Sequence, residues 1–488
     1  MGKSLILCDC CGSQEIDTEA LSTVEGLACS KVHTALCTRQ ADVAAAAMAG
    51  GDTIIACGQE QPVFDDIAHE IGAAPPQYLD LRDRAGWSDQ GATAGAKMAA
   101  LAAEALLPLP ATPAVDVISE GVCLIAGPGE VAVALARQLA GALTVTVLIT
   151  DDAEPPETRD FDVVRGRVRS VSGALGGFDL RLDALQTVVP GGRGGFAMSP
   201  PQDGAVSSCD IVVDVTGGVP LVPAPDKREG YLRADPRDSL AVAALALEAV
   251  QLTGTFEKPL YVKVDDSLCA HSRARQTGCS NCLDICPTGA ITPAGDHVAI
   301  DPMVCAGCGS CAALCPSTAI TYQAPDFRYG VMRMRTLAQA YRAVDGGAPR
   351  LLVHDAHGAE MIRLAARFGR GLPADVIPME VSALSGFGHS EMVSALAVGF
   401  ARVDVLLAPR TERAALEREQ ELAEALAGPG RLALLDEADP DALSDLLYEA
   451  APGAAPGRAI LPMGNRRQAA RMAAQALNPD AEAPLALP

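Results

Sequence analysis

Beyond its midpoint the chain reads Cys305-Ala-Gly-Cys308-Gly-Ser-Cys311-Ala-Ala-Leu-Cys315-Pro316. A second run, Cys279-x2-Cys282-x3-Cys286-Pro287, precedes it, and Cys269 stands ten positions before Cys279. Cysteines at these spacings hold [4Fe-4S] clusters. Three thiolates on one tight loop reach three irons of one cluster, and the cysteine before each proline, where the chain turns away, reaches the other cluster. The spacing therefore predicts two clusters that share cysteines between the runs.

The predicted ligands form two sets. One cluster is assigned to Cys269, Cys279, Cys282 and Cys315, and the other to Cys305, Cys308, Cys311 and Cys286. Repeated Cys-x2-Cys pairs also suit structural zinc. The two Cys-Pro endings, followed by the matching Gly289-Ala290-Ile291 and Thr318-Ala319-Ile320, favour iron and sulfide.

Residues 261–322 resemble two-cluster bacterial ferredoxins, and the resemblance implies an α+β domain over residues 258–328. The chain departs from that family in one gap. Where two residues are usual, nine stand here, including His271, Arg273 and Arg275. These cations either raise a cluster potential or dock a partner, or the gap is a solvated loop excursion.

The composition limits the functional classes. The net charge of −23 over 488 residues opposes binding to nucleic acid or to anionic membranes. The sixteen cysteines are clustered like metal ligands rather than spread like a disulfide framework, which favours a reducing cytoplasm. No uninterrupted apolar stretch reaches ~18 residues, so we expect no direct membrane insertion. The N-terminus lacks the features of a secretory signal.

The remaining chain predicts an α/β multidomain protein with parallel-sheet, Rossmann-like domains. Proline- and alanine-rich joints at residues 107–115 and 451–456, and a change of character near residues 254–259, mark the boundaries. We expect an N-terminal α/β domain at residues 1–107 and a degenerate FAD-domain-like fold at 115–254. A C-terminal α/β docking domain at 335–478 and a tail at 479–488 complete the chain.

Cysteines follow the predicted strands of the N-terminal domain, at the edge where parallel sheets place functional groups. They are Cys8, Cys10, Cys11, Cys29, Cys37 and Cys57. This grouping favours a third iron–sulfur cluster over structural or redox-active free cysteines.

The motifs around these cysteines resemble the N-terminal cluster domain of the A-type subunit of heterodisulfide reductase. They are Cys8-Asp-Cys10-Cys11-Gly12, Cys37-Thr-Arg-Gln40, Ile54-Ile55-Ala56-Cys57 and Leu81-Arg-Asp-Arg-Ala-Gly-Trp87. The resemblance implies Cys11, Cys37 and Cys57 as ligands, with Cys8, Cys10 and Cys29 competing for the fourth place. We assign Cys8 to that place. Before Trp87, where that family often has a further cysteine, this chain has none.

A strand, a glycine turn, a helix and a second strand follow at residues 122–149, the opening unit of a dinucleotide fold. Gly127, Gly129 and Ala132 occupy the three glycine positions, and the corresponding region of the resembling family binds FAD. Pro128 stands inside the turn and Ala132 replaces the third glycine. Bound FAD and a shrunken fold kept as a scaffold therefore both stay open. Cys123 and Cys209 are interpreted as core thiols.

Residues 376–409 are reminiscent of the small delta subunit of methyl-viologen-reducing hydrogenase, but without its cluster cysteines. That resemblance implies a docking domain without a metal. His354, His357 and His389 lie near predicted strand ends and are interpreted as surface or capping groups.

No catalytic constellation emerges from the sequence. It predicts a cytoplasmic iron–sulfur subunit that relays single electrons within an oxidoreductase complex and is not a catalyst by itself. One alternative is an FAD-dependent oxidoreductase, similar to the A-type subunit of heterodisulfide reductase, that splits electron pairs at the flavin. Another is an assembly or scaffold protein with structural clusters. The expected partners are redox subunits such as formate dehydrogenase or hydrogenase; the terminal donor and acceptor and the oligomeric state are left open.

Overall fold

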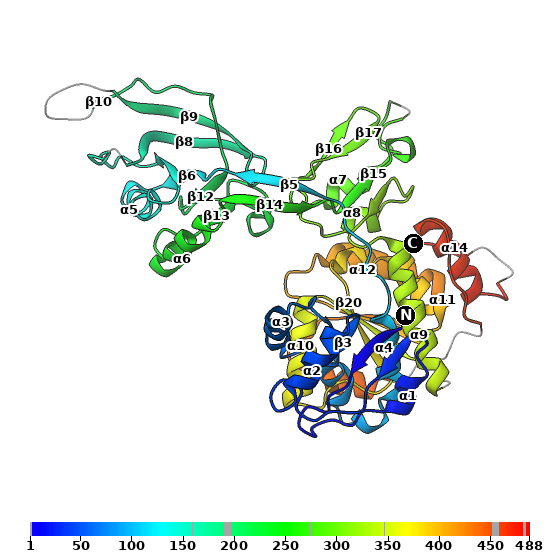
Figure 1. Ribbon diagram of the computed structural model, residues 1–488. Coiled ribbons are helices and arrows are strands. Elements are labelled where there is room, and N and C mark those ends of the chain that lie inside the picture. The colour runs from blue at the N-terminus through cyan, green and yellow to red at the C-terminus, as the bar shows by residue number, and fades with distance from the viewer. Residues whose placement is uncertain are drawn as a thin grey trace. The chain divides into compact units, whose positions relative to one another are not determined.

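The computed structural model describes residues 2–158, 160–189, 197–273, 275–345, 347–450, 458–481 and 485–488 (Figure 1). The chain forms two compact units. One consists of Met1–Ala111 and Cys308–Pro488, and the other of Thr112–Gly307. Helices and strands both contribute substantially and several sheets are parallel, which confirms the predicted α/β class. The predicted joint at residues 451–456 lies outside the described residues. Within the described chain, no helix is long and apolar enough to cross a membrane.

The first sheet of the larger unit is built from the N-terminal residues. Its strands are β1 (Lys3–Ile6), β2 (Leu27–Cys29), β3 (Thr53–Ile55) and β4 (Gln77–Tyr78). They are parallel and lie in the order β2-β1-β3-β4. The accompanying helices are α1 (Thr18–Ser22), α2 (Ala41–Ala49), α3 (Gln61–Glu70) and α4 (Gly95–Glu104). The strand order reverses at β1, so the crevice that such sheets use for ligands lies at the carboxyl ends of β1 and β3.

The second sheet of this unit repeats the same order with C-terminal residues. Its strands are β19 (Arg350–His354), β20 (Val376–Glu380), β21 (Arg402–Leu406) and β22 (Leu432–Leu435), all parallel in the order β20-β19-β21-β22. The helices are α9 (Phe327–Asp345), α10 (Ala356–Phe368), α11 (His389–Val398), α12 (Arg413–Ala427), α13 (Pro440–Glu449) and α14 (Arg466–Leu477).

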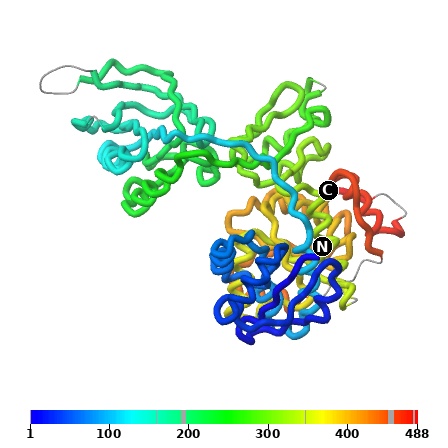
Figure 2. The backbone as a smooth tube through the Cα atoms, viewed as in Figure 1, coloured from blue at the N-terminus to red at the C-terminus, as the bar shows by residue number. Residues whose placement is uncertain are grey.

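These two sheets share one hydrophobic core. Residues 95–102 of α4 are all buried, and α4 packs along α9. A single cluster of buried side chains includes Leu5 and Met98 from the N-terminal sequence and Leu351 and Ile377 from the C-terminal sequence. Figure 2 shows the two chain segments side by side. The predicted ranges 1–107 and 335–478 therefore belong to one folded unit.

Polar groups also cross this core. The ammonium group of Lys97 is fully buried and donates to the carbonyl oxygens of Pro373 at 2.7 Å and Leu372 at 3.3 Å. Burial lowers the pKa of Lys97 to about 7. On the α4–α9 contact, Arg333 forms an ion pair with Glu104 at 2.8 Å. Such buried polar groups are stable only with their partners in place, so they tie the N-terminal and C-terminal sequences together.

The other unit contains a larger mixed sheet. Strands β6 (Val122–Gly127), β7 (Thr144–Ile149), β8 (Asp162–Ser172), β12 (Ile211–Asp214) and β13 (Tyr231–Arg233) form its parallel part in the order β8-β7-β6-β12-β13. Strands β9 (Phe178–Val189), β10 (Ala197–Met198) and β11 (Ala205–Cys209) extend it antiparallel. Separately, β5 (Ala114–Ser119) pairs antiparallel with β14 (Gly254–Pro259).

Different elements cover the two faces of this sheet. Helices α5 (Gly129–Leu139) and α6 (Ser239–Val250) cover one face. Strand β9 and Cys209 supply much of the core on the other face, where a second helical layer is usual in dinucleotide folds. Cys123 and Cys209 are buried in these two cores, and burial raises the pKa of each thiol to about 12. They are packing residues, as the sequence indicates.

Candidate iron–sulfur centres

The two cysteine runs fold into loops of the same kind. Helix α7 (Asn281–Ile285) carries Cys282 and precedes Cys286-Pro287, while helix α8 (Ser310–Ala313) carries Cys311 and precedes Cys315-Pro316. Each loop then passes through a residue with positive φ, Gly289 at 69° and Thr318 at 59°, and enters a short strand. These strands are β16 (Ile291–Ala294), which pairs with β17 (His297–Ile300), and β18 (Ile320–Tyr322). The sequence repeat is therefore also a repeat of local structure.

A hydroxyl group stands beside the last cysteine of each run. The Thr288 hydroxyl oxygen lies 3.7 Å from the Cys286 sulfur, and the Ser317 hydroxyl oxygen lies 3.7 Å from the Cys315 sulfur. Hydrogen bonds to sulfur tune the electronic properties of cluster ligands. The two loops thus place a donor at the same position relative to the cysteine before the proline.

The nine-residue gap between Cys269 and Cys279 is closed at its base. The Gly278 amide donates to the His271 carbonyl at 2.7 Å. A Cβ atom at Gly278 would lie 3.0 Å from the carbonyl oxygen of Ala270, so a side chain there would be crowded. Because His271 and Gly278 are joined by this hydrogen bond, only Ala270, His271 and Gly278 separate Cys269 from Cys279 when the connection is followed across the bond. This hydrogen bond joins the two ends of the gap, so the extra residues do not have to lie between Cys269 and Cys279.

Two of the three basic side chains in this gap hold the backbone of the predicted ligands. His271 is buried, and its Nδ1 donates to the Cys279 carbonyl at 2.9 Å, since a carbonyl oxygen only accepts. The Arg273 Nε donates to the Cys269 carbonyl at 2.7 Å. Arg275 is exposed with a φ of 59°. The first two side chains therefore position the loop, and Arg275 faces solvent.

Residues 277–319 match the family model of the 4Fe-4S dicluster domain. This segment of the chain is therefore similar to the iron–sulfur domains of that family. This finding confirms the predicted iron–sulfur chemistry and supports electron transfer. The match contains seven of the eight assigned cysteines and leaves out Cys269, so the bridged gap lies at its boundary. No curated protein matches the chain.

The N-terminal cysteines gather at the crevice between β1 and β3. Cys8, Cys10 and Cys11 follow β1, Cys57 follows β3, and Cys37 precedes α2; all five line one cavity of about 100 Å³. Cys29 does not line this cavity. It ends β2, pairs with Leu5 of β1, and packs against the hydrophobic core. Of the three competitors for the fourth ligand position, Cys8 and Cys10 line the cavity with the other predicted ligands, and Cys29 lies elsewhere.

The backbone before this cavity is strained. Cys10 and Cys11 both have positive φ, 53° and 61°, a conformation that residues other than glycine rarely adopt. The Cys11 amide donates to the Thr34 carbonyl at 2.6 Å, and the side chain of Asp9 accepts from the Gly12 amide at 2.8 Å. Strain of this kind persists where the surrounding structure fixes it and clusters at functional sites.

The thiols around the cavity would need a bound cationic group to be stable as thiolates. Burial raises the pKa of Cys37 and of Cys57, and nearby thiols raise it further. The Glu60 amide donates to the Cys57 sulfur at 3.4 Å, and the Arg82 guanidinium donates to the Cys10 sulfur at 3.4 Å. Within the described residues, no three His, Cys, Asp or Glu side chains converge on one metal-ion position. A [4Fe-4S] cluster differs from a single ion because its four cysteines bind separate irons.

The glycine turn of the dinucleotide-like fold is filled by the protein itself. The Asp151 carboxylate accepts from the Gly129 amide at 3.1 Å, at the start of α5 where a pyrophosphate would lie. The position of a Gly129 Cβ atom is 2.5 Å from the Cβ of Ala153. Pro128 has no amide hydrogen, and Ala132 is buried in the core. In this conformation Gly127, Gly129 and Ala132 therefore do not fit an FAD pyrophosphate.

The carboxylate at the neighbouring strand end is also satisfied internally. Asp214, at the end of β12, is buried and accepts from the hydroxyls of Tyr231 and Thr216 and forms an ion pair with Arg233 at 3.3 Å. The strand order reverses between β6 and β12, so this is the crevice where such folds bind ligands. Both oxygens of its acidic group therefore already have partners within the fold.

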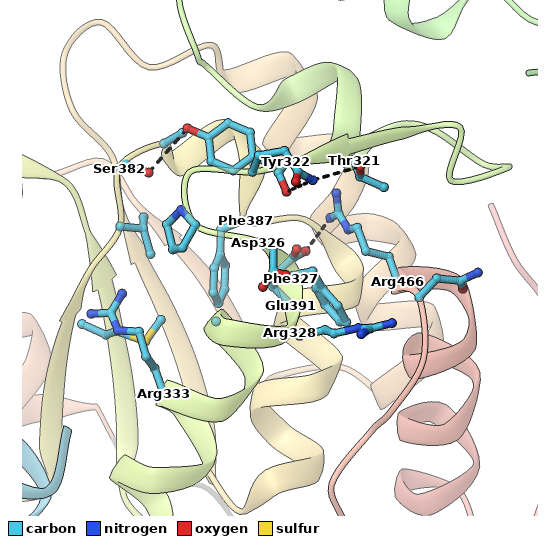
Figure 3. A pocket seen from close by; sticks show the side chains of 18 of the residues that line it. Thr321, Tyr322, Asp326, Phe327, Arg328, Arg333, Ser382, Phe387, Glu391 and Arg466 are labelled. Carbon is cyan, nitrogen blue, oxygen red and sulfur yellow. Dashed lines mark hydrogen bonds and ion pairs between the residues drawn. The ribbon is translucent and has the colours of Figure 1, made fainter. Parts of the chain in front are cut away.

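The C-terminal half of the larger unit holds a cavity of about 280 Å³ (Figure 3). Its part-buried Glu391 pairs with Arg466 at 2.5 Å, and Arg333 forms an ion pair with Glu104. Phe327 and Phe387 supply apolar walls. These charges are paired within the protein, which indicates a structural role.

The three C-terminal histidines do not come together as ligands. His354 is buried, its Nδ1 donates to the Asp355 carbonyl at 2.9 Å, and burial lowers its pKa to about 4. His389 instead forms a 2.6 Å contact with Glu419. His354 and His357 flank the start of α10, while His389 begins α11.

Proposed function

We propose that this chain is the electron-transfer subunit of a redox complex and relays single electrons through two [4Fe-4S] clusters. The match over residues 277–319 supports the clusters, and the hydrogen bond from Gly278 to His271, which shortens the path between Cys269 and Cys279, supports a complete set of eight ligands. Cys286 and Cys315 each serve the cluster of the other run.

When bound, such clusters take up and release one electron at a time. The residues of this chain supply the environment. His271 and Arg273 hold the backbone of two ligand cysteines, and the hydroxyls of Thr288 and Ser317 lie beside the cysteine sulfurs. None of these side chains needs to exchange a proton with a substrate, which agrees with a relay rather than a catalyst.

Protein purified without oxygen is expected to contain about eight irons and eight sulfides from this segment. On reduction it should give the electron paramagnetic resonance spectrum of two magnetically coupled [4Fe-4S] clusters. Reconstitution with zinc alone serves as the control for structural metal binding. Stoichiometric zinc without sulfide in the anaerobic protein would overturn the proposal.

A third [4Fe-4S] cluster is proposed at the N-terminal cavity, held by Cys37 and Cys57 with two of Cys8, Cys10 and Cys11. Five thiols around one cavity, strained backbone at two of them, and donors aimed at two sulfurs support it. Cys8 and Cys11 remain the assigned pair, and the arrangement favours Cys10 equally as a ligand.

For this third cluster, Cys37→Ser and Cys57→Ser in the full chain are each expected to lower the iron content by about four. Each removes a thiolate that bonds a separate iron. Cys29→Ser is the matched control, because Cys29 belongs to the same sheet but lies outside the cavity. Iron analysis and the visible spectrum measure the outcome. Full iron in Cys57→Ser, or equal loss in Cys29→Ser, contradicts the assignment.

Flavin is expected to be absent or substoichiometric in the purified protein. A pyrophosphate would have to displace Asp151 from the Gly129 amide, and Pro128 provides no amide in exchange. Flavin fluorescence after acid release measures the content. One flavin per chain would instead favour the FAD-dependent oxidoreductase.

We further propose that the partners are other redox subunits of the cytoplasm, such as formate dehydrogenase or hydrogenase. The resemblances to the A-type subunit of heterodisulfide reductase and to the delta subunit of hydrogenase motivate this part of the proposal. Co-purification from the native cell under anaerobic conditions tests it.

A further inference from the structure

A buried arginine connects the dinucleotide-like fold to one cysteine loop. Arg228 follows the short 3-10 helix Pro225–Lys227, and only 7% of its surface is exposed. Its Nη1 donates to the Gly173 carbonyl at 2.7 Å, and its Nη2 donates to the Thr288 carbonyl at 2.7 Å. Thr288 is the residue whose hydroxyl lies beside the Cys286 sulfur. Arg228 therefore contacts a residue that lies two positions after the predicted cluster ligand Cys286.

Among the described residues this guanidinium forms no direct ion pair. Its two hydrogen-bond acceptors are carbonyls, and its buried Nε has no partner. Burial lowers the pKa of Arg228, while Asp301 and Cys286 are the negative groups close enough to oppose that effect. A buried charge without compensation is strongly destabilising. The buried charge of Arg228 is therefore only partly compensated, and Cys286 is one of the two negative groups that act on it.

The next residue, Glu229, is connected through two further side chains to the loop of Cys305, which contributes to the same predicted cluster. Glu229 forms an ion pair with the buried Lys258 at 2.6 Å, and Lys258 lies 5.5 Å from the centroid of the Tyr261 ring. That ring packs on Gly307, where a Cβ atom would be 2.7 Å from Tyr261 Cδ1. Gly307 has a φ of 74° and lies between Cys305 and Cys308.

Arg228 thus contacts the loop of Cys286 directly, and Glu229 is connected to the loop of Cys305 through Lys258 and Tyr261. These two cysteines are assigned to the same cluster, although they come from different runs. We propose that Arg228 is a positioning residue that raises the reduction potential of that one cluster. The inference rests on the proposed function. Reduction adds one negative charge, and a desolvated cation nearby stabilises the reduced form more than the oxidised form. In this proposal the dinucleotide-like fold contributes a positive charge, that of Arg228, to the surroundings of a cluster.

A redox titration monitored by electron paramagnetic resonance tests this on the full chain. Arg228→Gln is expected to shift one cluster to a more negative potential by at least tenfold in the equilibrium constant for reduction, which is 59 mV for one electron. The other cluster should keep its potential. Arg228→Lys keeps the charge and should stay within threefold of the unaltered protein. Arg237→Gln is the control, because Arg237 is exposed and its ion pair is with Asp235, two positions away in the sequence.

Three results would overturn the inference: no shift in Arg228→Gln, an equal shift of both clusters, or the same shift in Arg228→Lys as in Arg228→Gln. If Arg228→Gln loses a cluster, Arg228→Lys decides. An intact cluster at unchanged potential there supports the role of the charge, and the same loss there assigns Arg228 a structural role only. Absence of two clusters from the unaltered protein would instead contradict the proposed function.

Discussion

Cys286→Ser is expected to destroy the cluster assigned to Cys305, Cys308 and Cys311, although Cys286 belongs to the other run. Cys315→Ser is expected to destroy the cluster assigned to Cys269, Cys279 and Cys282. In each variant the iron content should fall by about four, and the magnetic coupling between the two clusters should vanish. Cys209→Ser is the control, because Cys209 is a buried core thiol away from both runs.

The surviving signal separates crossed ligation from local ligation. If the runs are crossed, the cluster left in Cys286→Ser has the spectrum of the one left in Cys308→Ser. If each run holds its own cluster, it has the spectrum of the one left in Cys282→Ser. The comparison needs no assumption about potentials. Retention of both clusters in Cys286→Ser and in Cys315→Ser would remove both cysteines from the ligand sets.

The dicluster segment was predictable because its chemistry is local in sequence. Ligand spacing, the prolines after Cys286 and Cys315, and the glycine or threonine that follows each run all lie within a few residues of one another. The parallel α/β class was predictable for the same reason, from short apolar runs alternating with helical ones. Closure of the gap after Cys269 was not, because it depends on one hydrogen bond between His271 and Gly278.

The N-terminal site shows what strand order adds. Sequence places Cys8, Cys29 and Cys57 alike, each at the end of a short apolar run. Strand order distinguishes them: β1 and β3 are neighbours, and the crevice lies at their carboxyl ends, while Cys29 sits on β2 at the far side of β1. No pattern in a single sequence reveals which strand will be the edge.

The dinucleotide-like fold shows a limit of a different kind. Glycine spacing correctly indicates the strand, turn and helix at residues 122–139. It does not reveal that Asp151 will accept the amide of Gly129, or that Arg228 will reach the loop after Cys286. Both contacts join residues far apart in sequence, and both bear directly on which ligand the fold can serve.

Deleting residues 335–488 is expected to unfold the N-terminal α/β region together with its predicted cluster site. The deletion removes most of α9 and the whole second sheet, so it exposes α4, whose residues 95–102 are all buried, and leaves Lys97 without its carbonyl acceptors. Each large apolar side chain returned to water costs about 1.5–3 kcal/mol. Loss of several such contacts exceeds the roughly 5–15 kcal/mol that holds a typical domain folded.

Circular dichroism, limited proteolysis and iron content measure this outcome in the truncated chain. Deletion of residues 479–488 alone is the matched control, because these residues follow α14 and none of those that the structure describes belongs to the shared core. A cooperatively folded, monomeric fragment 1–334 that retains the iron of the N-terminal cavity would refute the shared core as the source of its stability. For the same reason, docking by the C-terminal sheet is better tested by substituting exposed residues of the full chain than by truncation. If the truncated chain fails to bind its partner, unfolding of the N-terminal region is enough to explain the loss, and the result does not identify a docking surface.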